Sequence, residues 1–92
     1  MAAGTARRSE RFRLSLRPNG LPYARLALVV AKRHAPRAVD RNRVRRLARE
    51  AFRIHQQRFA GQDLVVRLTA SIAERPVTLA EIEALLLGSR RA

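Results

Sequence analysis

The stretch Arg41-Asn42-Arg43-Val44-Arg45-Arg46-Leu47-Ala48-Arg49-Glu50-Ala51-Phe52-Arg53 combines six arginines with a regular apolar pattern. Its apolar residues recur every three or four positions, which predicts one buried face of a helix. That face comprises Val44, Leu47, Ala48, Ala51, Phe52, His55 and Phe59. The arginines occupy the rest of the helix surface, where guanidinium groups can bind phosphates through paired hydrogen bonds. A solvated basic face is the alternative, but only Asp40 and Glu50 offset the arginines, so we favour a helix that binds a nucleic-acid backbone.

Strand-like segments lie on both sides of this helix. Residues 12–17 alternate, with Phe12, Leu14 and Leu16 on one side and Arg11, Arg13, Ser15 and Arg17 on the other. Residues 25–32 form a more apolar run after the turn signal Pro18-Asn19-Gly20, and we expect the two runs to pair as an antiparallel hairpin. Residues 63–70 predict a third strand. Residues 1–8 are expected to form a tail or a weak edge strand.

A second helix is predicted near the end of the chain. Thr78 and Glu81 make a capping box, Val77 can pack on Ile82, and Gly88 is a natural stop. The order (β)-β-β-α-β-α predicts an α+β fold in which a small mixed sheet of three to four strands packs with two helices. At 92 residues the chain is expected to be one domain, with fraying at 1–8 and 89–92.

The charge balance points to a polyanionic partner. Twenty Lys and Arg against seven Asp and Glu give a formal net charge of +13. The chain has no cysteine, which excludes disulfides and thiolate metal sites and favours the cytosol. No apolar run approaches the roughly 20 residues of a membrane span. No metal-ligand spacing, Gly-rich phosphate loop or Ser/His/Asp pattern nominates a catalytic residue, a metal site or a small-molecule substrate.

Two further groups of residues are candidates for RNA contacts. Lys32 and Arg33 close the second run and either extend the basic patch or form an exposed strand end. Arg11, Arg13 and Arg17 predict a basic sheet face that suits single-stranded RNA. The aromatics near that face are Phe12 and Tyr23, and for Phe12 both stacking on RNA and packing in the core remain open.

Residues 37–53 resemble the RNR signature of the bacterial ribonuclease P protein component, and the match extends over roughly residues 4–90. The resemblance implies a ribonuclease P protein-like fold with a left-handed βαβ crossover. It also implies an RNA-binding subunit that assists endonucleolytic removal of 5′ leaders from precursor tRNA, with the chemistry and its Mg²⁺ in the catalytic RNA subunit. The implied contacts to that RNA are Arg41, Asn42, Arg43, Arg45, Arg46 and Arg49 with Lys32 and Arg33 beside them, and Arg53 joins them from the helix pattern. Phe12, Arg11 and Arg13 are the candidate contacts to the leader.

One departure from the family concerns the first residues. Family members begin with a helix carrying a Phe-x-x-Val-Phe-like pattern that forms one wall of the leader cleft, and this sequence shows no counterpart. We expect the reading frame to extend upstream of Met1. Two alternatives to the family role stay open: a general RNA-binding or ribosome-associated protein, and a DNA-binding protein that lays the arginine helix in a major groove, which the flanking strands disfavour.

Overall fold

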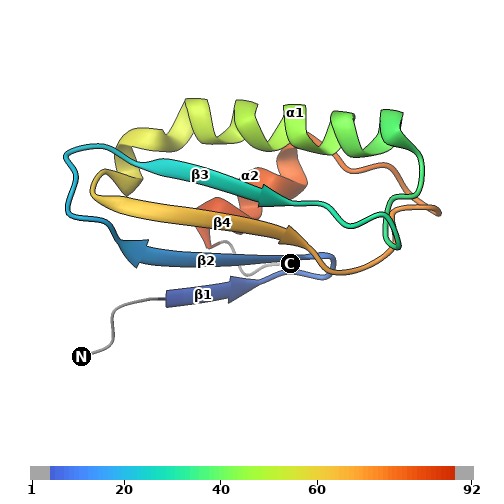
Figure 1. Cartoon of the computed structure of the whole chain (residues 1–92), viewed down its shortest axis with the longest axis horizontal. Helices are drawn as coiled ribbons and strands as arrows, with labels where there is room; N and C mark the ends of the chain where they lie inside the picture. The colour runs from blue at the N-terminus through green and yellow to red at the C-terminus, as the bar shows by residue number, and fades with distance from the viewer. Residues whose placement is uncertain (1–4, 89–92) are drawn as a thin grey trace.

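The computed structural model describes residues 5–88, which form a four-stranded sheet with two helices on one of its faces (Figure 1). The strands are β1 (Thr5–Arg8), β2 (Phe12–Pro18), β3 (Arg25–Val29) and β4 (Gln62–Leu68), and the helices are α1 (Ala38–His55) and α2 (Leu79–Leu87), with a short 3-10 helix, η1 (Gln56–Phe59), directly after α1. The predicted α+β class and element order are confirmed, with the edge strand present at 5–8. The fraying predicted for residues 1–4 and 89–92 concerns positions outside the described residues.

The strand order in the sheet is β1-β2-β4-β3. β4 pairs antiparallel with β2 and parallel with β3, so the chain crosses from β3 to β4 through α1. The predicted hairpin between the runs at 12–17 and 25–32 is therefore wrong, because β4 lies between them. Leu64, Val66 and Leu68 of β4 are all buried, whereas Leu26, Leu28 and Val29 of β3 are only half-buried at the edge of the sheet. The turn at 18–20 reverses the chain without making its two strands neighbours.

The hairpin in this fold is instead the one formed by β1 and β2. Their pairing is antiparallel, with Thr5 opposite Leu16 and Arg8 opposite Arg13. In the connecting turn the backbone N–H of Ser9 donates to the carbonyl of Phe12 at 2.9 Å. The short, polar segment at 5–8 becomes a strand because it pairs with β2, and its own sequence carries little signal for this.

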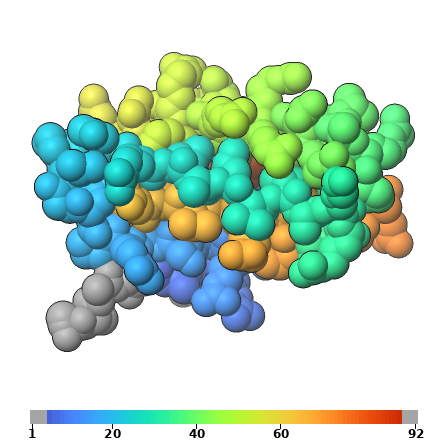
Figure 2. Space-filling model, viewed as in Figure 1, coloured from blue at the N-terminus to red at the C-terminus, as the bar shows by residue number. Residues whose placement is uncertain are grey.

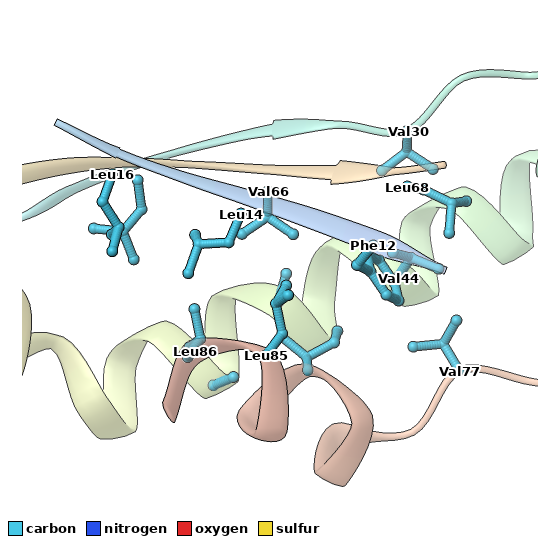
Figure 3. Close-up of a cluster of buried hydrophobic side chains, with 14 of the residues drawn as sticks. Phe12, Leu14, Leu16, Val30, Val44, Val66, Leu68, Val77, Leu85 and Leu86 are labelled. Carbon is cyan, nitrogen blue, oxygen red and sulfur yellow. The ribbon is translucent and has the colours of Figure 1, made fainter. Parts of the chain in front are cut away.

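The core lies between the sheet and both helices. Alternate residues of β2 and β4 point to the same face, and the predicted alternation from Phe12 to Leu16 is confirmed by their burial. Figure 3 shows these side chains meeting those of α1 and α2. The residues contributed by the helices are Val44, Ala48, Ala51, Ile82, Leu85 and Leu86. Each fully buried leucine, isoleucine or phenylalanine contributes about 1.5–3 kcal/mol through removal from water. Because both helices use this face, the opposite face of the sheet is open.

The helix ends follow their local chemistry. α1 ends at His55, and the apolar pattern predicted to continue to Phe59 is completed by η1. Thr78 Oγ1 accepts a hydrogen bond from the backbone N–H of Glu81 at 3.2 Å, which confirms the cap of α2. Only half of the predicted capping box forms, because the Glu81 carboxylate binds Arg11. Gly88 closes α2 in the left-handed conformation, with φ of 71°, as predicted.

The strand predicted for residues 25–32 is shorter in the structure. β3 ends at Val29, and the chain then turns, with the backbone N–H groups of His34 and Ala35 donating to the carbonyl of Ala31 at 3.1 and 3.2 Å. Lys32 and Arg33 therefore lie exposed on the turn that leads into α1 and not at a strand end. The chain must leave the sheet here in order to start a helix that crosses its inner face.

Candidate nucleic-acid interface

The outer face of α1 is presented to solvent because its inner face is locked in the core. Val44, Ala48 and Ala51 are buried, one helical turn apart, and fix the rotation of the helix about its axis. The arginines of the sequence signature then project away from the sheet. Figure 2 shows the α1 side chains along the upper edge of the molecule.

Five of the predicted RNA-binding residues share one shallow groove on this face. The groove encloses about 520 Å³ and is lined by Asn42, Arg45, Arg46, Arg49, Glu50 and Arg53. We call it the arginine groove. It brings together four guanidinium groups, one amide and one carboxylate. Rigid, planar guanidinium groups at helical spacing suit the repeated phosphates of a nucleic-acid backbone.

The carboxylate in the groove is committed to one arginine. Glu50 accepts two hydrogen bonds from Arg53, at 2.7 and 3.1 Å, across one turn of α1. These hydrogen bonds lower the pKa of Glu50 and raise the pKa of Arg53. Arg53 is thus partly neutralised, whereas none of Arg45, Arg46 and Arg49 forms an ion pair within residues 5–88. Those three supply most of the positive potential of the groove.

Arg41 and Arg43 lie outside the arginine groove, although the family signature includes both. The Arg41 guanidinium donates to the backbone carbonyls of Ala35 and Pro36, each at 3.0 Å, so it holds the loop before α1. Arg43 lines a different hollow of about 350 Å³ between the start of α1 and the loop after β4, together with Arg37, Ile72 and Glu74. Helical spacing cannot reveal either position, because both depend on where distant loops return to the helix.

A second basic surface covers the open face of the sheet. The pairing register places Arg8, Arg13 and Arg67 opposite one another across β1, β2 and β4. All three are exposed. Like charges directly opposite each other destabilise a sheet, so this row indicates a surface shaped by an anionic partner. Sequence reasoning identified only Arg13. The alternation within 63–70 was a signal that could have placed Arg67 on the same face.

A second cross-strand row closes the other end of this face, where Arg17 and Arg25 flank Asp63. Arg25 donates two hydrogen bonds of 2.8 Å to Asp63, and Asn19 donates a third of 3.0 Å. Together they lower the pKa of Asp63 to about 2. Between the two rows the residues are small, namely Ala6, Ser15, Val65 and Ala27. We call this surface the sheet face: a flat track bordered by arginines.

The position predicted for Arg11 needs correction. Arg11 is only 4 % exposed and is not on the sheet face. Its guanidinium donates to both oxygens of Glu81, at 3.0 and 2.6 Å, and to the carbonyl of Arg75 at 2.6 Å. The hydrogen bonds to Glu81 raise the pKa of Arg11. Arg11 therefore joins the β1–β2 turn to the start of α2. The alternation failed here because β2 begins only at Phe12.

Phe12 belongs to the core, which was one of its two predicted roles. It is 1 % exposed and packs on the side of the sheet that faces the helices. Its ring is not available to an RNA strand on the sheet face. Of the predicted leader contacts, Arg13 alone lies on an accessible surface.

The part of the chain that the structure describes offers no cluster of three or more His, Cys, Asp or Glu side chains suited to a metal ion. His55 is partly buried and its Nε2 lies 2.9 Å from Glu83 Oε2, which links α1 to α2 and agrees with the packed role predicted for it. Within residues 5–88, none of the helices has the length and apolar character needed to cross a membrane.

Comparison with known proteins places this geometry in context. The family model described as Ribonuclease P matches residues 1–87. The ribonuclease P protein component of Nitrosococcus oceani is 44% identical over 75 residues, which is 82% of this chain and 63% of that protein. The corresponding protein of Paraburkholderia xenovorans is 44% identical over 91 residues, covering 87% of this chain and 65% of that protein. The chain thus spans less than two thirds of the length of these relatives.

The fold agrees with the sequence comparison. The ribonuclease P protein of Thermotoga maritima, solved in complex with 1-(4-fluorophenyl)-2-thiourea, superposes with a TM-score of 0.78 at 32% identity. The match covers 92% of this chain and 81% of that structure. The family model spans nearly the whole chain, and the neighbour shares both its fold and almost a third of its sequence. This chain belongs to the ribonuclease P protein family.

Proposed function

We propose that the chain is the RNA-binding protein subunit of ribonuclease P and assists the catalytic RNA in endonucleolytic removal of the 5′ leader from precursor tRNA. The observation that carries this proposal is the presence of two separate basic surfaces on opposite sides of a two-layer fold. The arginine groove lies on the outer face of α1, and the sheet face lies beyond the core on the other side. A protein with two such surfaces can hold two RNA elements at once.

Each surface suits a different element. The groove presents guanidinium groups on a rigid helix, which fits the closely spaced phosphates of a structured RNA, so we assign it the RNA subunit. The sheet face offers a flat track between two rows of arginines, which fits an extended single strand such as the leader of precursor tRNA. Lys32 and Arg33 flank the start of α1 and are assigned to the RNA subunit with the groove.

In this proposal the protein contributes charge and position, and the bond cleavage belongs to the RNA. Arginines that neutralise phosphates of both RNAs reduce the repulsion between catalyst and substrate. The Mg²⁺ that the reaction requires is assigned to the RNA subunit, since the described residues do not provide a carboxylate cluster to hold it. The bacterial cytoplasm, where precursor tRNA is made, is the proposed place of action.

Reconstitution with a catalytic RNA subunit tests the proposal. The chain should stimulate precursor-tRNA cleavage at Mg²⁺ concentrations where the RNA alone is slow. Failure to stimulate, with RNA binding intact, would instead support a general RNA-binding or ribosome-associated protein. Preference for duplex DNA over structured RNA in competition would support the DNA-binding alternative.

A double variant tests the assignment of the sheet face. Arg13→Ala with Arg67→Ala should weaken binding of precursor tRNA to the reconstituted enzyme and leave binding of mature tRNA, which has no leader, unchanged. Equal weakening of both tRNAs would contradict a leader contact at this surface.

A further inference from the structure

We infer that Tyr23, in the loop between β2 and β3, is a stacking platform for one unpaired nucleobase at the end of the sheet face. The inference deepens the proposed function, because it adds a base contact to surfaces that otherwise offer only charge. It starts from the distribution of aromatic rings. Phe12 and Phe59 are 1 % and 5 % exposed, and Phe52 packs against the core. Tyr23 is 56 % exposed and is the one large open ring among residues 5–88.

The loop that carries Tyr23 is held in one conformation by polar contacts. The Tyr23 carbonyl accepts hydrogen bonds from Asn19 Nδ2 at 3.1 Å and from the backbone N–H of Gly61 at 3.3 Å. Asn19 Oδ1 accepts from the backbone N–H of Leu21 at 2.8 Å, and the Asn19 backbone N–H donates to the Gly61 carbonyl at 2.9 Å. Gly61 has a φ of 85°, a conformation that a side chain would strain. The backbone under the ring is therefore ordered before any ligand binds.

An ordered backbone matters because a stacking residue on a mobile loop must lose conformational freedom when it binds. Here that entropy has already been lost in folding. An exposed aromatic ring on a loop whose backbone is anchored through the Tyr23 carbonyl is thus prepared to receive a flat apolar partner. A single exposed tyrosine is unremarkable on its own. The anchoring and the charges around it distinguish this one.

The electrostatic surroundings select an anionic ligand. Tyr23 stands two positions before Arg25, whose pKa is raised chiefly by its hydrogen bonds to Asp63. Arg17 completes the row from β2, with Asp63 of β4 between it and Arg25, and is exposed. Arg25 is paired with Asp63, whereas Arg17 forms no ion pair within residues 5–88, so Arg17 is the member of the row that can reach a phosphate. The ring and Arg17 match the two parts of a nucleotide, its base and its backbone.

The position of the loop continues the track on the sheet face. The row of Arg17, Asp63 and Arg25 closes that face, and the loop of Tyr23 leads directly into Arg25, the first residue of β3. Figure 1 places this loop at the end of the molecule where α1 ends, and Figure 2 shows that it protrudes there. The unpaired base can come from a strand leaving the sheet face or from the RNA subunit near the end of α1. In both cases the ligand is an unpaired nucleobase attached to a phosphate backbone.

The composition of the chain supplies a direct assay. The chain contains one tyrosine and no tryptophan, so its intrinsic emission reports on Tyr23 alone. A base stacked on the phenol ring quenches that emission. We expect an oligouridylate of about eight nucleotides to quench it, and an abasic oligomer of equal length to bind through its phosphates with little quenching. Free tyrosine amide at the same absorbance corrects for light absorbed by the RNA. Equal quenching by the two oligomers, or none by either, would overturn the inference.

Variants give a second readout. Tyr23→Ala should weaken oligouridylate binding roughly 5- to 150-fold, which is the range for loss of one base stack, and leave abasic binding unchanged. Tyr23→Phe keeps the ring and should bind as the unchanged chain does. Tyr23→Leu keeps the bulk without a flat face and should behave like Tyr23→Ala. Equal affinity of the alanine and phenylalanine variants for oligouridylate would refute the stacking role.

The reconstituted enzyme distinguishes the source of the base. Tyr23→Ala weakens precursor-tRNA binding if the base belongs to the substrate, and weakens assembly if it belongs to the RNA subunit. An effect on neither would contradict the inference. Because the oligouridylate assay needs neither RNA subunit nor cleavage, base-dependent quenching in a chain that fails to stimulate cleavage would refute only the proposed function.

Discussion

Removing two arginines from the arginine groove should change the salt dependence of RNA binding by a calculable amount. Arg45 and Arg49 lie four positions apart on α1, line the same groove, and form no ion pair within residues 5–88. We therefore expect both to neutralise phosphates of the RNA subunit. Alanine is the best helix former, so Arg45→Ala with Arg49→Ala should leave α1 and the fold intact.

The magnitude follows from counterion release. Each neutralised phosphate contributes about 0.7 to 0.9 to the slope of log K against log salt. If about six phosphates are contacted, the unchanged chain should show a slope of about −4 to −5, and the double variant a slope of about −3. Counterion release contributes nothing at 1 M salt, so at 0.1 M the two arginines account for a factor of about 25 to 60 in affinity, or about 2 kcal/mol.

The assay is a titration of the RNA subunit at several salt concentrations, with thermal unfolding as a check on the fold. A matched control removes two exposed arginines outside the groove, through Arg58→Ala with Arg75→Ala. The control lowers the net charge by the same amount as the groove variant. Its slope of log K against log salt should change by less than half as much as the slope of the groove variant. If both double variants changed the slope equally, binding would depend on net charge alone. If the groove variant kept the original slope, the groove would not contact phosphates.

Three further outcomes follow from the ion pairs. Glu50→Gln removes the carboxylate of the groove and frees Arg53. RNA affinity should therefore rise several-fold, and the slope of log K against log salt should become more negative by up to about one. Unchanged affinity would show that Arg53 does not contact the RNA. Arg11→Met leaves Glu81 without its buried partner and should lower the free energy of unfolding in urea by about 3 kcal/mol, and a loss below about 1 kcal/mol would contradict a structural role for the pair. The pKa of Asp63 is lowered from its ordinary 3.8 to about 2, so the charged form stabilises the fold above pH 3.8 and that stability is lost as the pH falls towards 2. Asp63→Asn should remove this part of the pH dependence. If the variant and the unchanged chain had identical stability profiles between pH 4 and pH 2, the stabilising role of the Asp63 carboxylate would be refuted.

Local patterns predicted the elements that carry their own periodicity. The apolar stripe through Val44 and Ala51 defined α1, and the alternation from Phe12 to Leu16 defined β2 and its buried side. Thr78 and Gly88 marked the ends of α2 because caps depend on a few neighbouring residues. In each case the predictive signal lies within a few neighbouring residues of the sequence.

Strand order was not predictable in the same way. The turn chemistry at Pro18-Asn19-Gly20 is real, yet β2 and β3 are separated by β4. The central place of β4 goes with the burial of Leu64 and Val66 in the shared core, a property of the whole fold. A single sequence contains no local mark of that competition.

The residues of the candidate surfaces also differ in whether local sequence patterns could locate them. Residues of the arginine groove could be found from helical spacing, because a helix brings positions 42, 45, 46, 49 and 53 to one side. Arg11 was misplaced, and the loop contact of Arg41 was not foreseen, because their partners, Glu81 and the Ala35 carbonyl, come from other segments. The row of Arg8 and Arg67 required the register of three strands.

The central place of β4 also determines the order in which the protein can take shape as it leaves the ribosome. When residue 55 has been made, α1 is complete in sequence, but β3 has no partner strand and β2 has only β1. The inner edges of β2 and β3 then lack a hydrogen-bonding partner until residues 62–68 emerge. The helix that carries the arginine groove is therefore made before its supporting sheet is complete. Its final orientation is therefore set by a strand that is synthesised after it.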